Sequence, residues 1–429
     1  MKRRKFFKIT GFSLLVLFFA GLIARLLKTK SGNYAPYFSK LNQSLKKYKK
    51  ANPFLLIDLD VLDENLLELK KLIPTNKSFR VVVKSLPSIE LLNYIMQKVS
   101  TKKLMIFNQS FLTQISKYSD TTIDILFGKP MPIKAVNYYY DTLVVENGFH
   151  ASKQVQWLVD TEKRINEYIN FAKQNNIKLL LNIEIDVGLH RGGFSTLESL
   201  RKSLQIISKN KEHVTFSGFM GYDAHIVKVP SVLLSREKGY QNMCDFYNAC
   251  KNLVKNDFQE LWNDNLTFNG AGSPTLGLHN QPSSPLNDIS AGSFAVMPTD
   301  FDIDTLEQFK PASFIATPIL KEYNNTNLPS IESLSNILNV WDPNMQNSYY
   351  IFGGSWMANY YQPEGISGNA IFGKSTNQVM INASNETKLD VGDYVFLRPH
   401  QSEFVFLQFG EVLAIRNAKI VNNWSLLNI

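Results

Sequence analysis

A small set of residues could form one reaction site: a lysine, an arginine, a tyrosine and two turns rich in glycine and serine. They are Lys84, Arg191, Tyr222, the run Gly270-Ala271-Gly272-Ser273-Pro274-Thr275 and the run Ala291-Gly292-Ser293. A desolvated lysine amine can form a Schiff base with the aldehyde of a cofactor. An arginine can stabilise a neighbouring phenolate, and backbone amides and hydroxyls in glycine turns bind phosphate. Together these residue types predict a site for an aldehyde cofactor that carries a phosphate group.

Each of these residues alone has an ordinary structural explanation. A lysine that closes a strand is commonly a solvated end, an arginine is commonly a salt-bridge partner, and a Gly-x-Gly run is commonly only a turn. Lys84, however, follows Val81-Val82-Val83, so we expect it to be buried at the end of a strand. A buried lysine is costly unless its charge is paired or neutralised. The hypothesis of a site depends on the position that these residues share.

The elements that would position them alternate regularly from Arg80 onward. Short β-rich runs alternate with longer helical patterns such as 152–175, which is typical of a parallel sheet with crossover helices. The predicted strands are 80–84, 103–108, 122–128, 142–146, 178–186, 215–222, 266–270 and 287–294. Eight such units predict a (β/α)8 barrel of TIM type, whose active site lies at the carboxyl ends of the strands and which often binds phosphate after strands seven and eight. The set described above lies at or just after such ends.

The sequence pattern also predicts where the barrel begins and ends and what flanks it. Residues 51–311 are predicted to form the barrel, and 312–429 a smaller β-rich domain, because strands and turns without long helices follow residue 312. The run 55–59 precedes the barrel and is a candidate strand of that second domain. Residues 31–50, which are rich in lysine, are predicted to be a basic tether.

Residues 1–30 have the pattern of an export leader. A basic start is followed by an apolar run at 9–27, as in a signal peptide or an uncleaved transmembrane anchor. Arg3-Arg4-Lys5-Phe6-Phe7-Lys8 resembles the twin-arginine export signal. The leader predicts an exported protein, anchored in the inner membrane or periplasmic, with the twin-arginine route and ordinary secretion both open.

The charge distribution argues against nucleic-acid binding by the part of the chain that follows residue 30. The net charge is +9, but eight of the 46 basic residues lie within residues 1–30, where there is no Asp or Glu. The remaining 38 basic residues face 37 acidic ones, without a basic stripe. Cys244 and Cys250 are the only cysteines, and their spacing on one predicted helix points them in different directions, so we expect two inert thiols.

Several motifs resemble those of the fold-type III pyridoxal 5′-phosphate enzymes, the alanine racemase N-terminal domain superfamily. The resemblance is to the D-threonine aldolase and D-serine dehydratase group, in its amino acid deaminase/aldolase branch, and covers roughly residues 52–415. The matching runs are Asn52-Pro53-Phe54, Asp58-Leu59-Asp60, Arg80-Val81-Val82-Val83-Lys84-Ser85, Asp186-Val187-Gly188-Leu189-His190-Arg191-Gly192-Gly193, Gly221-Tyr222-Asp223-Ala224-His225 and Gly270-Ala271-Gly272-Ser273-Pro274-Thr275. Their number and order imply an alanine-racemase-like barrel with pyridoxal phosphate as cofactor.

The resemblance also implies roles. Lys84 would hold the cofactor and return as a base, Arg191 would contact the ring oxygen of the cofactor, and Tyr222 would help to fix it. The residues implied to hold the phosphate are Gly270, Gly272, Ser273 and Thr275. Gly292 and Ser293 are predicted to bind the cofactor from their place at the end of the eighth strand.

This chain departs from the family's pattern at two places. In the characterised relatives a divalent metal held by His-x-Asp or His-x-Cys activates the 3-hydroxyl group of the substrate. His400 fits that motif, but Ser402 is a poor ligand, so a metal would need Glu403 or water. Leu86 stands where the family has a histidine, so His225 or His400 would do acid-base work, unless these histidines are structural.

These expectations favour a lyase that cleaves or dehydrates an amino acid, and the resemblance implies that the substrate is a D-3-hydroxy amino acid. The first alternative is an amino acid racemase of the same fold, which needs a second acid-base group on the opposite face of the substrate. The second is a non-catalytic, membrane-tethered protein that binds the cofactor or an amino acid. The resemblance further implies a homodimer.

Overall fold

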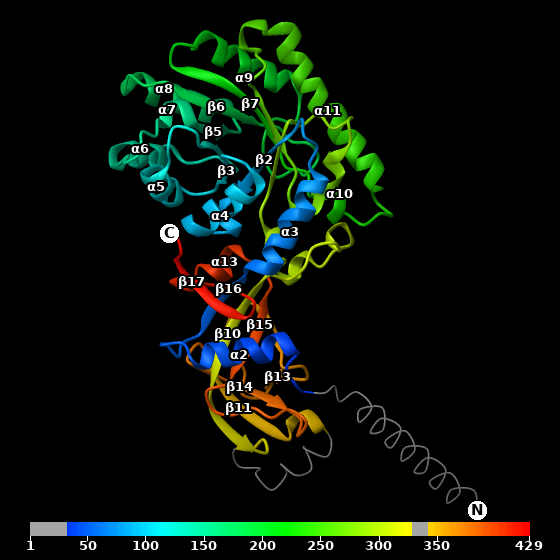
Figure 1. Ribbon diagram of the computed structural model, residues 1–429. Coiled ribbons are helices and arrows are strands. Elements are labelled where there is room, and N and C mark those ends of the chain that lie inside the picture. Colours follow the sequence, from blue (N-terminus) through cyan, green and yellow to red (C-terminus); the bar gives the residue numbers. More distant parts are fainter. Residues whose placement is uncertain (1–31, 328–341) are drawn as a thin grey trace, which may run out of the picture. The chain divides into compact units, whose positions relative to one another are not determined.

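The computed structural model describes residues 32–327 and 342–429, and the chain divides into two compact units (Figure 1). The barrel unit comprises Leu59–Ala312, Gln401–Glu411 and Trp424–Ile429. The β unit comprises the described residues up to Asp58, Ser313–His400 and Val412–Asn423. The chain therefore passes between the units several times, whereas the sequence pattern predicts a boundary at residue 311 and one candidate strand of the second domain, 55–59, before the barrel.

The barrel unit contains a closed barrel of eight parallel strands, which confirms the predicted barrel fold. The strands, in barrel order, are β2 (Ser78–Val82), β3 (Lys103–Ile106), β4 (Asp124–Phe127), β5 (Val155–Val159), β6 (Leu179–Glu184), β7 (Val214–Gly221), β8 (Thr267–Gly270) and β9 (Asp288–Ala291). The ring closes where β2 pairs with β9, with Arg80 opposite Ser290. Because all eight strands are parallel, their carboxyl ends meet at one end of the barrel.

One predicted strand is wrong. The run 142–146 begins at the last residue of α6 (Ile133–Thr142) and continues as a loop, where Val144 is 57% exposed. The fourth barrel strand is β5, which lies inside a stretch that the sequence pattern assigns to a helix. Every residue of β5 is buried, including Trp157. Local β propensity favours both runs, and burial in the barrel wall decides between them.

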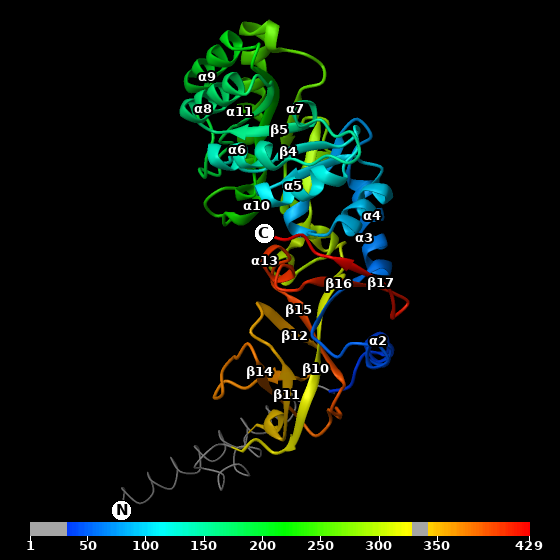
Figure 2. The ribbon, with the colours of Figure 1, turned by 90° about the vertical axis from the view of Figure 1, so that its left-hand side faces the viewer.

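Helices lie outside the barrel strands (Figure 1, Figure 2). Besides α6, the long ones are α3 (Leu59–Leu72), α4 (Ile89–Val99), α5 (Gln109–Tyr118), α8 (Glu162–Gln174), α9 (Leu197–Lys209) and α11 (Arg236–Asp257). Five begin after a residue whose side chain accepts a hydrogen bond from the first turn, namely Ser88, Asn108, Thr161, Thr196 and Ser235. Each buries an apolar stripe, which in α4 consists of Leu91, Leu92, Ile95 and Met96.

The β unit is built on a nine-stranded sheet, as predicted for a β-rich second domain. Its strands are β1 (Phe54–Asp58), β10 (Ser313–Asn324), β11 (Asn347–Phe352), β12 (Ala358–Gln362), β13 (Ser367–Gly368), β14 (Gln378–Ala383), β15 (Tyr394–Pro399), β16 (Glu411–Arg416) and β17 (Lys419–Ser425). β1 pairs antiparallel with β10 and parallel with β16. The strand expected at 55–59 therefore belongs to this sheet and not to the barrel.

The segment predicted to be a basic tether contains a helix, α2 (Pro36–Lys46). Phe38, Leu41 and Leu45 lie on its buried face and pack into the core of the β unit. Lys46 Nζ lies 2.6 Å from Asp393 Oδ1. The prediction of a tether rests on the lysines, which lie on the exposed side of the segment. The apolar residues at spacings of three and four instead form the buried face of a helix.

The described residues include no helix that is both long and apolar enough to cross a membrane. The predicted leader, residues 1–30, lies outside the described ranges, so signal peptide and membrane anchor stay predictions.

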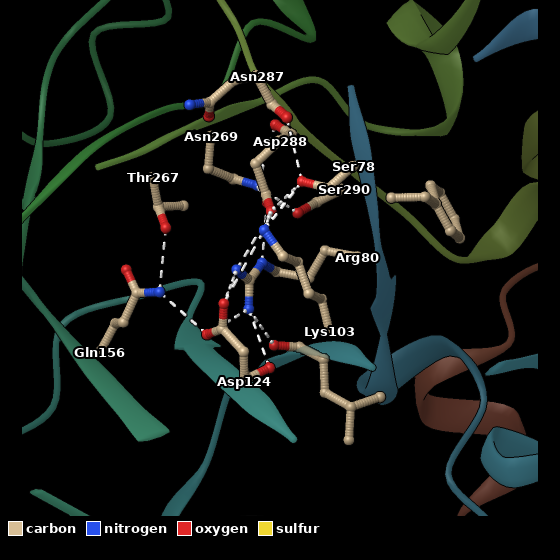
Figure 3. A network of polar contacts seen from close by, with 12 residues as sticks. Ser78, Arg80, Lys103, Asp124, Gln156, Thr267, Asn269, Asn287, Asp288 and Ser290 are labelled. Atoms are coloured by element: carbon tan, nitrogen blue, oxygen red, sulfur yellow. Dashed lines mark hydrogen bonds and ion pairs between the residues drawn. The ribbon is translucent and has the colours of Figure 1, made fainter. Parts of the chain in front are cut away.

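The interior of the barrel holds a buried ion network (Figure 3). The fully buried Arg80 donates from Nε to Asp288 Oδ1 at 2.9 Å and from Nη2 to Asp124 Oδ2 at 3.0 Å. Lys103 Nζ lies 2.9 Å from Asp288 Oδ2. Burial by itself would raise the pKa of Asp288, but Arg80 and Lys103 outweigh it and hold that pKa well below its usual range. Asn269 Nδ2 also donates to Asp288, which links the network to the residues above it.

Candidate active site

A pocket opens at the carboxyl ends of the barrel strands and lies wholly within the barrel unit. About 620 Å³ of space free of protein atoms lies in this pocket, with open solvent at its mouth included. Predicted site residues that line it are Lys84, Arg191, Tyr222, Gly272, Ser273, Gly292, Ser293 and Glu403. The structure thus brings together most of the set that the sequence suggested.

Lys84 follows strand β2, in the short 3-10 helix η1 (Val83–Ser85). Its Nζ lies 3.3 Å from Glu403 Oε1 and 4.5 Å from the centre of the Phe107 ring. The expectation of a buried lysine is wrong, because the side chain is 40% exposed. Its backbone is fixed by the buried strand, while the amine reaches into the pocket and is paired there with a carboxylate.

Glu403 comes from the segment that the sequence suggested as a metal site. It begins the short helix α13 (Glu403–Phe406), and its Oε1 accepts a hydrogen bond from Ser85 Oγ at 3.4 Å as well as facing Lys84. Ser85 Oγ also lies 3.1 Å from Ser293 Oγ. The carboxylate is therefore tied to the residues around Lys84.

Arg191 and Tyr222 form one wall of the pocket. The guanidinium carbon of Arg191 lies 4.9 Å from the centre of the Tyr222 ring, in a cation-π arrangement. Burial raises the pKa of Tyr222, with Asp223 adding to the effect and Arg191 opposing it, so the phenol is neutral at neutral pH. Arg191 follows a loop that Asp186 organises by accepting from the backbone N–H groups of Gly188 and His190.

The two glycine turns allow a close approach that no side chain would permit. A Cβ on Gly272 would lie 2.6 Å from Cε2 of Tyr222, and a Cβ on Gly292 would lie 2.9 Å from Cβ of Ser85. Gly272 precedes the 3-10 helix η3 (Ser273–Asn280). The two glycines leave backbone and serine hydroxyl groups at the pocket wall, which is the donor set that phosphate requires.

Two residues expected to hold phosphate do not line the pocket. Thr275 is fully buried, and its hydroxyl donates to Asp223 Oδ1 at 2.7 Å. Gly270 is the last residue of β8, and a Cβ there would lie 2.9 Å from the carbonyl oxygen of Gly221 in the barrel wall. Direct phosphate contacts from Thr275 and Gly270 are therefore not part of the site as the structure places it.

The two candidate histidines lie elsewhere than expected. His225, at the start of α10 (His225–Lys228), is buried, and its Nε2 would be 2.8 Å from a Cβ on Gly188. It does not line the pocket, and burial lowers its pKa. His400 belongs to the β unit, where its Nε2 lies 2.9 Å from Asn359 Oδ1. Within the barrel unit, His225 is therefore not brought into the pocket that Lys84 lines.

The metal site suggested by His400 and Glu403 is not formed in the described part of the chain. Within residues 32–327 and 342–429 there is no group of three His, Cys, Asp or Glu side chains that could hold a metal ion. Ser402, which occupies the position of the second ligand, is buried with no hydrogen-bond partner for its hydroxyl among those residues. The residues present do not fit the metal motif, and Glu403 faces Lys84 instead.

The sequence interpretation missed a carboxyl group beside Arg191. Glu184 is the last residue of β6, and with Arg191 and Tyr222 it lines a small cavity next to the pocket. Burial, reinforced by Asp160, raises the pKa of Glu184 to about 7, although Arg191 opposes the shift. Its position at the carboxyl end of a predicted strand was a signal that could have identified it.

The sequence model described as "Alanine racemase, N-terminal domain" matches residues 132–294. This segment includes Arg191, Tyr222 and both glycine turns, but not Lys84. No curated protein matches the chain by sequence.

Three solved structures share the fold of this chain. D-threonine aldolase from Filomicrobium marinum is 15% identical with a TM-score of 0.65, over 88% of this chain and 97% of that one. D-threo-3-hydroxyaspartate dehydratase from Delftia sp. HT23 is 13% identical with a TM-score of 0.67, over 90% and 99%. Alanine racemase from Clostridium difficile 630 is 15% identical with a TM-score of 0.67, over 89% and 100%. The resemblance of the chain to alanine-racemase-type barrels is confirmed.

The close approach at Gly272 makes a testable prediction. In the variant Gly272→Ala the added methyl group meets the ring of Tyr222, so we expect the affinity for pyridoxal phosphate to fall about tenfold or more. Gly277→Ala, inside the 3-10 helix η3 that Gly272 precedes, is the matched control, because a Cβ there meets nothing within 4 Å. Absorbance titration with the cofactor measures both, and equal affinities would contradict the role of Gly272.

Proposed function

We propose that this pocket binds pyridoxal 5′-phosphate and that Lys84 is its point of attachment. The observation that carries the proposal is that the amine of Lys84 opens into the same pocket as the turns at Gly272-Ser273 and Gly292-Ser293. An aldehyde and a phosphate are the two groups that this pair of features would recognise. The match to the alanine racemase domain supports the same cofactor.

The residues present fit that cofactor. Lys84 would hold its aldehyde carbon, Gly272, Ser273, Gly292 and Ser293 its phosphate, and Arg191 the oxygen of its ring, with Tyr222 packed beside it. When bound, pyridoxal phosphate supplies an electron sink that stabilises negative charge on the α-carbon of an amino acid.

The remaining chemistry belongs to the side chains of the pocket. Lys84 Nζ is the amine of this pocket that would take or return a proton at the α-carbon of the substrate. Glu403 Oε1 lies 3.3 Å from that nitrogen and can pass a proton to and from it. The positive charge of Arg191 would stabilise negative charge on the ring oxygen of the cofactor, and the neutral Tyr222 keeps its wall of the pocket uncharged.

We propose a lyase reaction on a D-3-hydroxy amino acid, by aldol cleavage or by dehydration. The fold shared with D-threonine aldolase and with D-threo-3-hydroxyaspartate dehydratase supports this class. Glu403 is the carboxylate that this pocket offers to receive or give the proton of a 3-hydroxyl group. No step through a metal ion is assigned, because the described residues do not form the family's metal motif.

A racemase is the second candidate, because the fold is shared equally with alanine racemase. A racemase needs acid-base groups on both faces of the α-carbon, and Lys84 with Glu403 lie within 3.3 Å of each other. This proximity favours the lyase, since both groups reach the substrate from one region of the pocket.

The reaction class is decided by product analysis of the protein loaded with pyridoxal phosphate. We expect D-threonine to give glycine and acetaldehyde, or D-serine to give pyruvate and ammonia, with and without added Mn²⁺ or Zn²⁺. Interconversion of D- and L-alanine without aldehyde or keto-acid release would replace the lyase by the racemase. Retained cofactor absorbance without turnover of any of these amino acids would identify a binding protein that lacks catalysis.

The location and assembly of the protein are proposals that depend on the sequence. We propose export by the leader at residues 1–30, with the body anchored to the inner membrane or released into the periplasm. Export of an already folded protein by the twin-arginine route would let the cofactor bind before export. A homodimer is proposed from the resemblance alone.

A further inference from the structure

We propose that a buried pair, Asp223 and His279, positions the phosphate-binding turn of the pocket without touching the cofactor. The inference rests on the proposed function, because it concerns how the site holds the phosphate of pyridoxal phosphate. Neither residue lines the pocket, and together with Thr275 and Ser284 they form a connected group that we call the Asp223 cluster.

Both carboxylate oxygens of Asp223 have hydrogen-bond partners inside the protein. Its Oδ2 lies 2.6 Å from His279 Nε2, and its Oδ1 accepts the hydroxyl proton of Thr275 at 2.7 Å. Because a carboxylate carries no proton, Nε2 of His279 is the donor. Nδ1 of His279 in turn lies 2.9 Å from Ser284 Oγ. The side chains of Asp223 and His279 are 1% and 0% exposed, so this group is closed to water.

The cluster joins the two chain segments that form one side of the pocket. Asp223 directly follows Tyr222, and Thr275 lies three residues after Gly272. Thr275 and His279 both belong to η3, so Asp223 holds this helix near both of its ends. The ring of Tyr222 meanwhile lies against Gly272, where a Cβ would be only 2.6 Å away. Asp223 therefore fixes two parts of the pocket: Tyr222, which it follows directly in the chain, and the turn at Gly272, against which the Tyr222 ring packs.

The length of η3 explains why such an anchor is needed. It runs for eight residues, from Ser273 to Asn280, whereas 3-10 helices longer than three or four residues are uncommon because their hydrogen bonds have poorer geometry. Two bonds from one buried carboxylate supply tertiary support to this conformation. A buried carboxylate that loses a partner is costly, so the loss of either bond is expected to let the turn at Gly272-Ser273 relax.

This arrangement changes the role of Thr275. A hydroxyl group has a single proton to donate, and that of Thr275 is committed to Asp223. Thr275 therefore acts on the phosphate through Asp223, as a positioning residue, and not as a direct ligand.

Comparing pyridoxal phosphate with pyridoxal, which lacks the phosphate group, tests the inference. In Thr275→Val we expect the dissociation constant of pyridoxal phosphate to rise about tenfold while that of pyridoxal is unchanged, because only the phosphate subsite is displaced. Thr275→Ser keeps the hydroxyl and should restore the affinity. Tyr139→Phe removes a buried hydrogen bond with Ser116 away from the pocket and should alter neither constant.

A double-mutant cycle separates positioning from direct contact. We expect Asp223→Asn combined with Thr275→Val to bind pyridoxal phosphate no more weakly than the weaker single variant, since both act through one path. Additive losses, or equal weakening of pyridoxal phosphate and pyridoxal, would overturn the inference. So would variants that bind like the wild type. A wild-type protein that binds neither compound would instead overturn the proposed function itself, which is a separate and visible outcome.

Discussion

Replacing Lys84 with alanine is expected to abolish covalent attachment of pyridoxal phosphate and to lower turnover by at least about 10²- to 10⁴-fold, the range for removing a positioned acid-base group. In the wild type, borohydride should fix the cofactor to this lysine, and mass spectrometry of the reduced protein should place the label at residue 84. In Lys84→Ala no label is expected at any position. The physical reason is that Lys84 is the amine that lines the pocket together with both glycine turns.

Lys84→Arg is the matched control for this variant. An arginine keeps a positive charge for Glu403, which lies 3.3 Å from the native amine, but it is a poor nucleophile toward an aldehyde. We expect Lys84→Arg to lose attachment as completely as Lys84→Ala while unfolding like the wild type. Labelling that persists at another lysine, or undiminished turnover in Lys84→Ala, would contradict the assignment.

The second large effect is expected from the ion network inside the barrel. Asp288→Ala leaves the fully buried guanidinium of Arg80 without one of its two carboxylates, and the free energy of unfolding should fall by about 3–5 kcal/mol. Urea unfolding followed by circular dichroism measures this loss. Glu64→Ala is the control, because Glu64 pairs with Lys310 at the surface, and it should leave the unfolding curve unchanged. An equally small effect of both substitutions would mean that the network does not stabilise the barrel.

The same carboxylate gives the stability a predictable dependence on pH. Arg80 and Lys103 overcome the cost of burial and hold the pKa of Asp288 well below that of an unfolded aspartate, which is about 3.9. A depressed pKa in the folded state contributes stability that is complete above the unfolded pKa and is lost as the pH falls below it. The wild type should therefore lose more stability than Asp288→Asn between about pH 5 and the acid limit of the measurement.

The network also bears on the site above it. Asn269 Nδ2 donates to Asp288 and, at 2.7 Å, to the hydroxyl oxygen of Ser290. Both Asn269 and Ser290 line the pocket. Figure 3 shows both residues beside the carboxylate of Asp288. Ion pairs between strands thus support the floor of the pocket, so a substitution there can change both stability and cofactor binding.

The sequence by itself determined the barrel and the neighbourhood of Lys84. Alternating β-rich and helical runs identify most of the strands, and parallel strands necessarily bring their carboxyl ends to one place. The sequence alone therefore groups Lys84, Tyr222 and the glycine turns, because each lies within a few residues of a strand end. Local pattern and one rule of topology were sufficient for them.

Only the tertiary structure decided what depends on contacts between distant segments. The choice of β5 over the run 142–146 follows from burial in the barrel wall, which local propensity does not encode. Glu403 reaches Lys84 across more than three hundred residues, since the chain returns to the barrel unit at Gln401. The hydroxyl of Thr275 turns to Asp223 because a buried carboxylate must be satisfied, and no pattern within either motif reveals that bond.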